Sequence, residues 1–299
     1  MRGLKMVESV GIELEVENIS RGKVPMAPIG DVLFSLTRDA SCETELNSFS
    51  GIRVDKGNVK KIYLDNRVFG LELISGVMDT ETDRYKYILK NLCNRVISLG
   101  ETPRSYRAGF HVHVNTPLSL EILKSIIRLG RNLEQVFFLV GCMGYDYRGK
   151  RNDSTYCRPI TKVGPPCVPL GNNSNRRYGK VIHIPDLLKS ETVNEFKLRY
   201  GDLDKVESTH GRYIPIRYHW LNLTNLWGKG SLEFRVFNKS LNSTFLYSVI
   251  ELCKAFALYA IESSFSSLKD AQMLGERSVF DITYPQQRDI IIKKFLKFA

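Results

Sequence analysis

A short segment near the beginning of the chain, residues 10–17, alternates apolar and acidic side chains. The apolar positions are Ile12, Leu14 and Val16, and the acidic positions are Glu13, Glu15 and Glu17. Because successive side chains of a β-strand point to opposite faces, this period of two predicts a strand with one apolar and one acidic face. The chain must therefore contain a sheet that buries one face and keeps polar groups on the other.

Further segments repeat this two-faced pattern with other polar residues. Residues 69–75 carry Glu72, residues 108–115 carry His111 and His113, and residues 231–237 carry Glu233 and Arg235. We also predict strands over 59–64 and over 216–223, the latter joined to 231–237 by a turn at residues 227–230. If the apolar faces of these strands pack on helices, their polar faces line one groove.

Helical periodicity and boundary residues predict the remaining elements. Apolar residues at helical spacing favour helices over 79–99, 119–140, 191–200 and 244–262, with Ser119 as the cap of the second, and a lysine-rich helix ends the sequence. Strands and helices follow one another without a fixed period, and no internal repeat is found. The sequence therefore belongs to a mixed class of helices and strands.

The polar faces of the predicted strands carry several carboxylates. Carboxylates held together repel one another unless cations balance them, and oxygen ligands with one imidazole suit Mg²⁺ or Mn²⁺ better than zinc. An arginine among them suggests a phosphate ligand. Each of these polar motifs alone is commonly the solvent-exposed face of a sheet. The prediction of a metal site therefore depends on the motifs of all four strands occurring together.

The charge of the chain is strongly positive, with a formal net charge of +11. Between residues 144 and 180 eight basic side chains face two acidic ones, in a segment rich in Gly, Pro and Asn. A loop this long inside a domain is usually functional. Two interpretations stay open: a solvated basic loop, or a segment that contacts anionic partners, including nucleic acid, through basic and tyrosine side chains.

Composition excludes several classes of protein. The sequence is 43% hydrophobic and 25% charged, close to an ordinary globular domain and unlike disordered, collagen-like or coiled-coil chains. We see no apolar run of membrane-spanning length and no secretory signal. The six cysteines are scattered without a C-x-x-C pair, which is typical of free thiols in a reducing compartment. We expect a cytoplasmic protein with no membrane partner.

The ordered set of motifs resembles a known family. The motifs are Gly11-Ile12-Glu13-Leu14-Glu15, Asp39-Ala40-Ser41, Gly70-Leu71-Glu72-Leu73-Ile74-Ser75, Gly109-Phe110-His111-Val112-His113-Val114-Asn115, Tyr218-His219-Trp220-Leu221-Asn222-Leu223 and Ser231-Leu232-Glu233-Phe234-Arg235-Val236-Phe237. They occur in the order seen in the amidoligases, small and often phage-encoded members of the glutamine synthetase and glutamate-cysteine ligase superfamily. The resemblance covers about residues 8–260.

This resemblance implies a fold and a set of roles. The fold is α+β, a curved antiparallel sheet whose concave face binds two or three Mg²⁺ and ATP, with helices on the convex face. The implied metal ligands are Glu13, Glu15, Glu72, His111 and Glu233. His113 and Arg235 are implied to contact the nucleotide phosphates, and Asp39 to receive and deprotonate an amine. We add Arg176 and Arg177 as candidates to close over the phosphates.

The activity implied is ATP-dependent ligation of a carboxylate to an amine through an acyl phosphate, with Mg²⁺ or Mn²⁺ and Arg235 stabilising the transferring phosphoryl group. The carboxylate and amine are not specified and could belong to a peptide or protein. We predict one catalytic domain over residues 1–263 with a basic lid at about 144–180, and a helical tail over 264–299. A metal-dependent phosphotransferase of the same fold and a nucleic-acid-binding protein are the alternatives.

Overall fold

The structure is a computed structural model, and it describes part of the chain. The described residues are 9–16, 29, 32, 34–38, 52–55, 58–61, 71–101, 104–141, 157, 159, 160, 184–200 and 219–274. Asp39, Arg176 and Arg177 lie outside them, as do residues 275–299 and nearly all of the basic segment 144–180.

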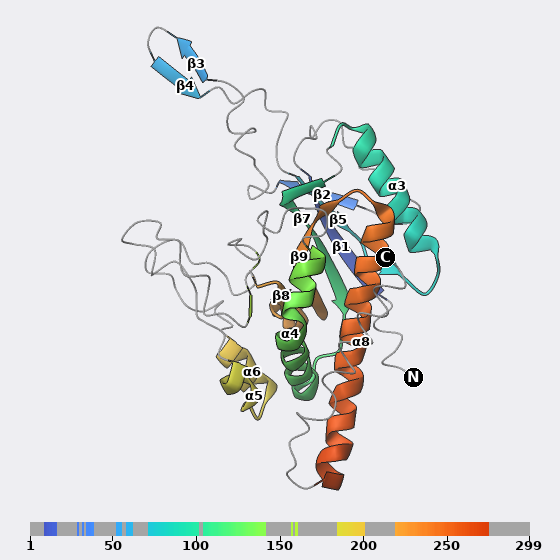
Figure 1. Cartoon of the computed structure of the whole chain (residues 1–299), viewed down its shortest axis with the longest axis vertical. Helices are drawn as coiled ribbons and strands as arrows, with labels where there is room; N and C mark the ends of the chain where they lie inside the picture. Colours follow the sequence, from blue (N-terminus) through green and yellow to red (C-terminus); the bar gives the residue numbers. More distant parts are fainter. Residues whose placement is uncertain are drawn as a thin grey trace.

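A seven-stranded antiparallel sheet forms the centre of the described structure (Figure 1). Its strands are β1 (Ser9–Val16), β2 (Phe34–Arg38), β5 (Leu71–Ser75), β6 (Met78–Asp79), β7 (Arg104–Asn115), β8 (Leu221–Asn222) and β9 (Ser231–Ser240). They are ordered β2-β5-β1-β7-β9-β8, and β6 pairs with the beginning of β1. A separate two-stranded sheet contains β3 (Ile52–Asp55) and β4 (Asn58–Lys61). The α+β class and the antiparallel sheet are confirmed, but the main sheet is neither closed nor strongly curled.

Three long helices cover one face of this sheet. They are α3 (Arg84–Ser98), α4 (Leu120–Gly141) and α8 (Ser243–Leu274). Shorter helices are α5 (Ile184–Leu188), α6 (Val193–Tyr200) and α7 (Thr224–Lys229). Helix α4 begins as predicted, because the Ser119 hydroxyl accepts a hydrogen bond from the Ile122 N–H at 3.2 Å. We call the covered side of the sheet the helix face.

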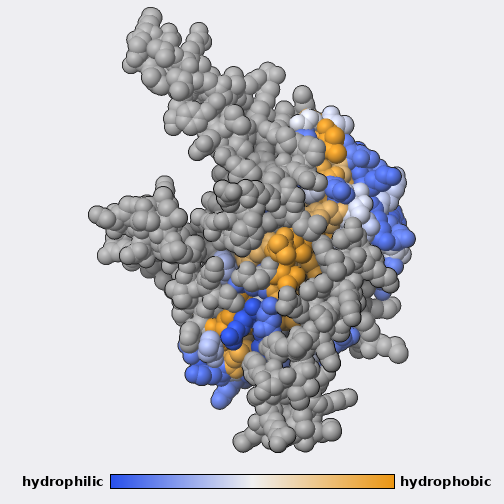
Figure 2. Space-filling view, viewed as in Figure 1, coloured by the Kyte–Doolittle hydropathy of each residue, from blue (hydrophilic) through white to orange (hydrophobic). Residues whose placement is uncertain are grey.

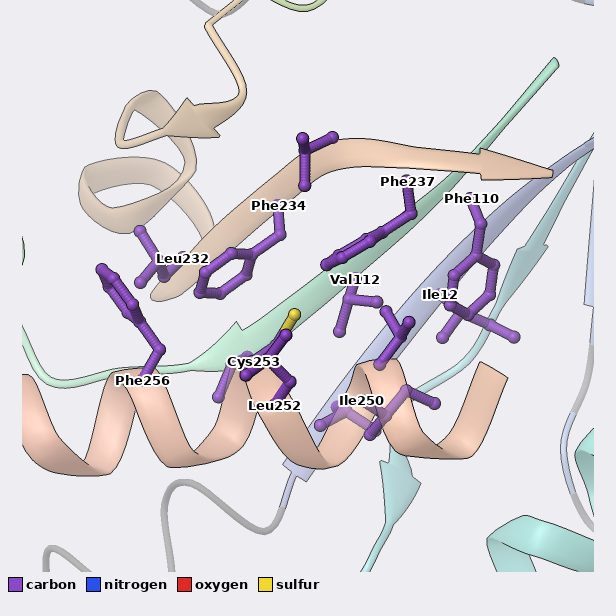
Figure 3. Close-up of a cluster of buried hydrophobic side chains, with 14 of the residues drawn as sticks. Ile12, Phe110, Val112, Leu232, Phe234, Phe237, Ile250, Leu252, Cys253 and Phe256 are labelled. Carbon is purple, nitrogen blue, oxygen red and sulfur yellow. The ribbon is translucent and has the colours of Figure 1, made fainter. Parts of the chain in front are cut away.

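The hydrophobic core lies between the helix face and α8. Figure 3 shows Phe234 and Phe237 of β9, with Phe110 of β7 and Ile12 of β1, on the side of the sheet that faces α8. The rings of Phe234 and Phe256 pack edge to face with their centroids 5.3 Å apart. Successive side chains of a strand point to opposite faces of the sheet. Because the apolar residues of these strands are buried against α8, the intervening polar residues lie on the opposite face.

Helix α3 has one side buried against the rest of the protein and one side exposed to solvent. Its buried residues are Tyr85, Ile88, Leu89, Leu92, Cys93 and Val96. Its outer surface is mainly hydrophilic in the space-filling view (Figure 2). This amphipathic pattern is the reason that the sequence predicted a helix here. The predicted start at residue 79 is wrong, because Asp79 lies in β6 and the helix begins at Arg84.

Helix α8 is long and apolar enough to cross a membrane by length and composition, with a mean hydropathy of 1.5 over Ser243–Ser264. In the structure 61% of its most apolar window is buried inside the protein. Packing on the sheet, visible in Figure 3, accounts for this composition. The helix also continues to Leu274, across the boundary predicted at residue 263, so the division into one catalytic domain and a helical tail stays a prediction.

The connection between β8 and β9 differs from the prediction. The predicted turn at 227–230 is wrong, because residues 224–229 form helix α7. The Asn222 side-chain oxygen accepts hydrogen bonds from both the N–H and the hydroxyl of Thr224, which starts the helix. Gly230, with a left-handed φ of 71°, ends it and leads into β9. Of the predicted strand 216–223, the described strand is Leu221–Asn222.

Candidate functional site

The polar side chains predicted from strand alternation meet on the side of the sheet opposite the helix face, which we call the site face. Three register rows bring them together. Glu72 of β5 pairs with Glu15 of β1, Glu13 of β1 with His111 of β7, and His113 of β7 with Glu233 of β9. Residues opposite one another on antiparallel strands point to the same face, so six predicted residues form one continuous patch.

Two groups of potential metal ligands lie within this patch. The first contains Glu13, Glu72 and His111, and the second contains Glu13, His113 and Glu233. In each group the ligand atoms lie within 4.8 Å of one another. Glu13 belongs to both groups because its two oxygens point to different histidines: Oε2 is 2.9 Å from His111 Nδ1, and Oε1 is 3.0 Å from His113 Nε2.

The spacing of these atoms fits a small divalent cation. An octahedral Mg²⁺ with bonds of about 2.1 Å places neighbouring ligands about 3 Å apart and opposite ligands about 4 Å apart. The nitrogens of His111 and His113 lie 3.9 Å from Glu72 Oε1 and 4.0 Å from Glu233 Oε1, respectively. The buried Nε2 of His113 and the Glu13 oxygen 3.0 Å from it lie in one of these groups, so a cation can bind both. The described residues therefore fit a magnesium- or manganese-type centre.

The charges of the site also call for a cation. Among the described residues, the cationic groups recorded beside the carboxylates of Glu13, Glu15, Glu72 and Glu233 are the guanidinium of Arg235 and the imidazoles of His111 and His113. Glu15, His111 and Glu233 are each less than 5% exposed, so water screens these charges poorly. A buried excess of negative charge is costly, and a bound divalent cation would remove most of it.

The pKa values within the site are strongly coupled. Burial raises the pKa of Glu13, but the hydrogen bonds and charges of His111 and His113 outweigh burial and hold the pKa below its ordinary value. Burial lowers the pKa of His113, but the hydrogen bond to Glu13 and the charge of Glu233 raise it overall. The carboxylate is therefore in the form that binds metal, and a cation must compete with a proton on His113.

Arg235 belongs to the same electrostatic network. Burial opposes ionisation of Glu233, yet the charges of Arg235 and the two histidines lower its pKa. Burial also works against the charge of Arg235, but Glu233 and Glu15 raise its pKa. The guanidinium donates a hydrogen bond to Glu233 Oε1, which fixes both groups beside His111 and His113. A permanently charged guanidinium at this place can bind an anionic group of a ligand.

The strand pattern did not reveal the two asparagines that hold Glu233. Asn222 Nδ2 and Asn225 Nδ2 both donate to Glu233 Oε2, at 2.5 and 2.8 Å. The Asn222 amide cannot flip without losing these contacts, because its oxygen accepts from Thr224. With Oε2 occupied, Glu233 turns Oε1 toward the histidines. A helix predicted in place of the turn could have drawn attention to Asn225.

Glu15 lies beside the two candidate groups of ligands, and belongs to neither. Its Oε1 is 3.3 Å from His111 Nε2, and its Oε2 accepts a hydrogen bond from the Gly109 N–H at 2.5 Å. In this position Glu15 orients the imidazole whose other nitrogen faces Glu13 and Glu72. Its predicted role as a direct metal ligand stays a prediction.

The remaining predicted site residues, Asp39, Arg176 and Arg177, lie outside the described residues. Three residues of the basic segment are described, and they contact the helix layer. The Ile160 N–H donates to Glu134 Oε2 at 2.6 Å, and the Pro159 carbonyl oxygen lies 3.2 Å from His219 Nδ1. These contacts tie the middle of the segment to α4 and to the residue before Trp220.

Comparison with known proteins identifies a family. A family model described as "Putative amidoligase enzyme" matches residues 7–257, close to the span of the resemblance noted from the motifs. The matched span contains both candidate ligand groups and Arg235. No curated protein matches the sequence.

Proposed function

Because this chain belongs to the amidoligase family, we propose that it is an ATP-dependent ligase that joins a carboxylate to an amine through an acyl phosphate. The family implies ATP use and substrates that carry a carboxylate and an amine. The mechanism, the metal and the substrates are the parts that we propose.

The observation that carries this proposal is the pair of ligand groups that share Glu13. Phosphoryl transfer from ATP requires cations that neutralise the phosphate oxygens, and adjacent oxygen-rich sites supply them. We propose Mg²⁺ or Mn²⁺ at both groups, with a third ion possible where Glu15 faces Glu72. When bound, the cations supply charge neutralisation to the transferring phosphoryl group.

The residues of the chain then have distinct tasks in the first step. Arg235, held beside the ligand groups by its hydrogen bond to Glu233, binds an oxygen of the γ-phosphoryl group. His113 faces either a cation, with Glu13 and Glu233, or the phosphates, as the resemblance implies. An oxygen of the substrate carboxylate attacks the γ-phosphorus, the bond to the β-phosphate oxygen breaks, and ADP leaves.

In the second step the amine nitrogen attacks the carbonyl carbon of the acyl phosphate. The carbon–oxygen bond to phosphate breaks, inorganic phosphate leaves, and the nitrogen gives up a proton. We propose Asp39 as the acceptor of that proton and the 144–180 segment, with Arg176 and Arg177, as the lid that keeps water from the acyl phosphate.

Nucleotide binding tests the first half of the proposal. Thermal unfolding of the wild type is measured with ATP alone, Mg²⁺ alone and both, and compared with Glu13→Gln/Glu233→Gln. We expect the largest stabilisation, by several degrees, when Mg²⁺ and ATP are both present, and none in the double variant. Glu121→Gln, at a surface position of α4, is the matched control and should behave as the wild type.

Product analysis separates ligation from the alternatives. Amine and carboxylate pairs are screened with ATP, and the release of ADP and phosphate together with an amide supports ligation. A stable phosphorylated product would assign a metal-dependent phosphotransferase instead. If neither nucleotide nor Mg²⁺ stabilises the protein, the ligase proposal is wrong, and nucleic-acid binding by residues 144–180 becomes the hypothesis to test.

We also propose a reducing, cytoplasmic location. Cys93, Cys157 and Cys253 are free thiols and are buried. Burial raises the pKa of Cys93 to about 12 and that of Cys253 well above its ordinary value, so these thiols are unreactive packing groups. The three described cysteines therefore pack as free thiols, which supports a reducing location.

A further inference from the structure

One side chain on the site face has polar atoms that no described contact explains. Asn238 of β9 is 3% exposed, and neither its Nδ2 nor its Oδ1 has a hydrogen-bond partner among the described residues. A buried donor and a buried acceptor without partners are costly, and native proteins pair the great majority of such groups. A carboxamide left in this state requires an explanation.

The neighbours of Asn238 place it on the site face. Phe237 points into the core on the helix face (Figure 3), and Lys239 forms a buried ion pair with Glu101, which follows α3. Between two residues directed to the helices, Asn238 must point to the other side of the strand. Its register partner is Gly109, whose N–H donates to Glu15.

This register puts the carboxamide in the row of Glu15 and Glu72, at one end of the patch. His113 and Glu233 form a row at the opposite end, where Asn222 and Asn225 satisfy the Glu233 carboxylate. The two ends therefore differ: at one end the side-chain amides of Asn222 and Asn225 donate to Glu233, and at the other end the side chain of Asn238 has no hydrogen-bond partner among the described residues.

From this difference we propose that Asn238 is a ligand-binding residue whose carboxamide pairs with a neutral group that presents an acceptor and a donor side by side. The proposal rests on the proposed function for the presence of a substrate on this face. Nδ2 would donate to the acceptor, and Oδ1 would accept from the donor. A carboxylate or an ammonium group would engage one atom and leave the other unpaired.

Two groups in an amide-forming reaction have this chemistry. One is the backbone of an extended peptide substrate, in which the N–H and the C=O of one residue point to the same side, and the other is the edge of adenine in ATP. The peptide is the source that we favour, because Asn238 lies two rows away from His113 and Glu233, and the phosphates are proposed to bind near that end.

The stability of the ligand-free protein provides a test that does not need activity. Asn238→Leu keeps the approximate volume of the side chain and removes both unpaired groups, so we expect the melting temperature to rise by about 2–5 °C. Asn222→Leu is the matched control, since Asn222 is equally buried on the adjacent strand but fully paired, and its melting temperature should fall. A fall in Asn238→Leu comparable to that in Asn222→Leu would show that Asn238 has a structural partner and would overturn the proposal.

A spectroscopic measurement identifies the ligand. The protein is labelled with ¹⁵N-asparagine, and the side-chain amide signals of Asn238 are assigned by their absence in Asn238→Leu. N-acetylalanine N-methylamide, which carries the N–H and C=O of one complete residue, is then titrated in the presence of Mg²⁺ and ADP, and Mg²⁺ with ATP is titrated separately. We expect the Asn238 signals to shift with this peptide mimic and not with the nucleotide.

The outcomes separate this inference from the proposed function. A shift with ATP but not with purine riboside triphosphate, whose base has acceptors but no donor on this edge, would assign adenine as the partner and keep the binding role of Asn238. No shift with either probe would overturn the inference, even where Mg²⁺ and ATP stabilise the protein. Stabilisation by Asn238→Leu without any nucleotide binding would instead remove the ligase proposal while leaving the unpaired carboxamide in need of a different ligand.

Discussion

On the helix face of the sheet buried carboxylates meet matched partners, whereas on the site face four carboxylates face one guanidinium and two imidazoles among the described residues. Glu101 and Lys239 form an ion pair in which both side chains have no exposed surface. Glu134 accepts hydrogen bonds from Trp220 Nε1 at 2.9 Å and from the Ile160 N–H at 2.6 Å. No comparable balance exists among the described residues of the site face.

The difference separates two uses of buried charge. A balanced ion pair offers no unsatisfied group to a ligand, because each charge is already neutralised by the protein. Removing one partner of such a pair destabilises the fold. An unbalanced cluster leaves a demand for positive charge that an ion from solution can meet. Substitutions on the helix face should therefore change stability first, and substitutions on the site face should change cation binding first.

The largest effect is expected from breaking the ion pair on the helix face. Lys239→Met leaves the Glu101 carboxylate buried without its cation, and we expect a loss of about 3–5 kcal/mol in the free energy of unfolding. Urea denaturation measures this loss. The double variant Lys239→Met/Glu101→Leu should recover most of it, and a double variant as unstable as the single one would contradict the ion-pair interpretation.

Next in size is the loss of the carboxylate shared by the two ligand groups. Glu13→Gln removes one ligand from each group, so we expect Mn²⁺ binding to weaken more than about 100-fold, since residues that only orient a ligand already account for 10- to 100-fold. Titration followed by Mn²⁺ paramagnetic resonance measures the affinity and the number of ions. Glu72→Gln affects one group alone, and should reduce the number of tightly bound ions without abolishing binding. Equal effects of the two substitutions would show that Glu13 is not shared.

The sequence was sufficient to predict much of this site, for a simple reason. Glu13, His111 and Glu233 lie on strands that alternate apolar and polar residues, and burying the apolar side of each strand fixes where the polar side points. The prediction that these strands lie together in one sheet rested on the order of the motifs, which resembles that of the family. The order β2-β5-β1-β7-β9-β8 depends on pairings between distant segments, which no local pattern specifies.

Asn238 could not be predicted, because β9 contains an irregularity. Continued alternation from Glu233 and Arg235 would place residue 237 on the site face and Asn238 on the helix face. The register between β7 and β9 shifts between the pairs Phe110/Phe237 and Val112/Phe234, so β9 has one extra residue there. Such a bulge reverses the faces of the residues beyond it. Asn225 was missed similarly, because its segment was predicted as a turn and forms α7.

The bulge in turn depends on a close contact with the helix layer. A Cβ added to Gly141, the last residue of α4, would lie 2.3 Å from the Val236 carbonyl oxygen. We therefore expect Gly141→Ala to cost about 2 kcal/mol of stability, as over-packing against a backbone group does, and to displace Val236 next to Arg235. Gly228→Ala is the control, because a Cβ there meets nothing within 4 Å. Chemical denaturation of both variants checks this, and equal stability would mean that α4 does not constrain the bulge.

The smallest effect is expected at the asparagines that donate hydrogen bonds to Glu233. Here a carboxylate of the site face has protein partners, as the carboxylates of the helix face do. Asn225→Ala removes one of the two donors to Glu233 Oε2 and leaves Asn222 in place. Since one donor still holds the carboxylate, we expect Mn²⁺ affinity to fall about tenfold, near the lower limit for a residue that orients a metal ligand. Asn91→Ala, at an exposed position of α3, should leave the affinity unchanged. If Asn225→Ala lowers stability without changing Mn²⁺ affinity, Asn225 serves the fold of α7, and the orientation of Glu233 depends on Asn222 and Arg235 instead.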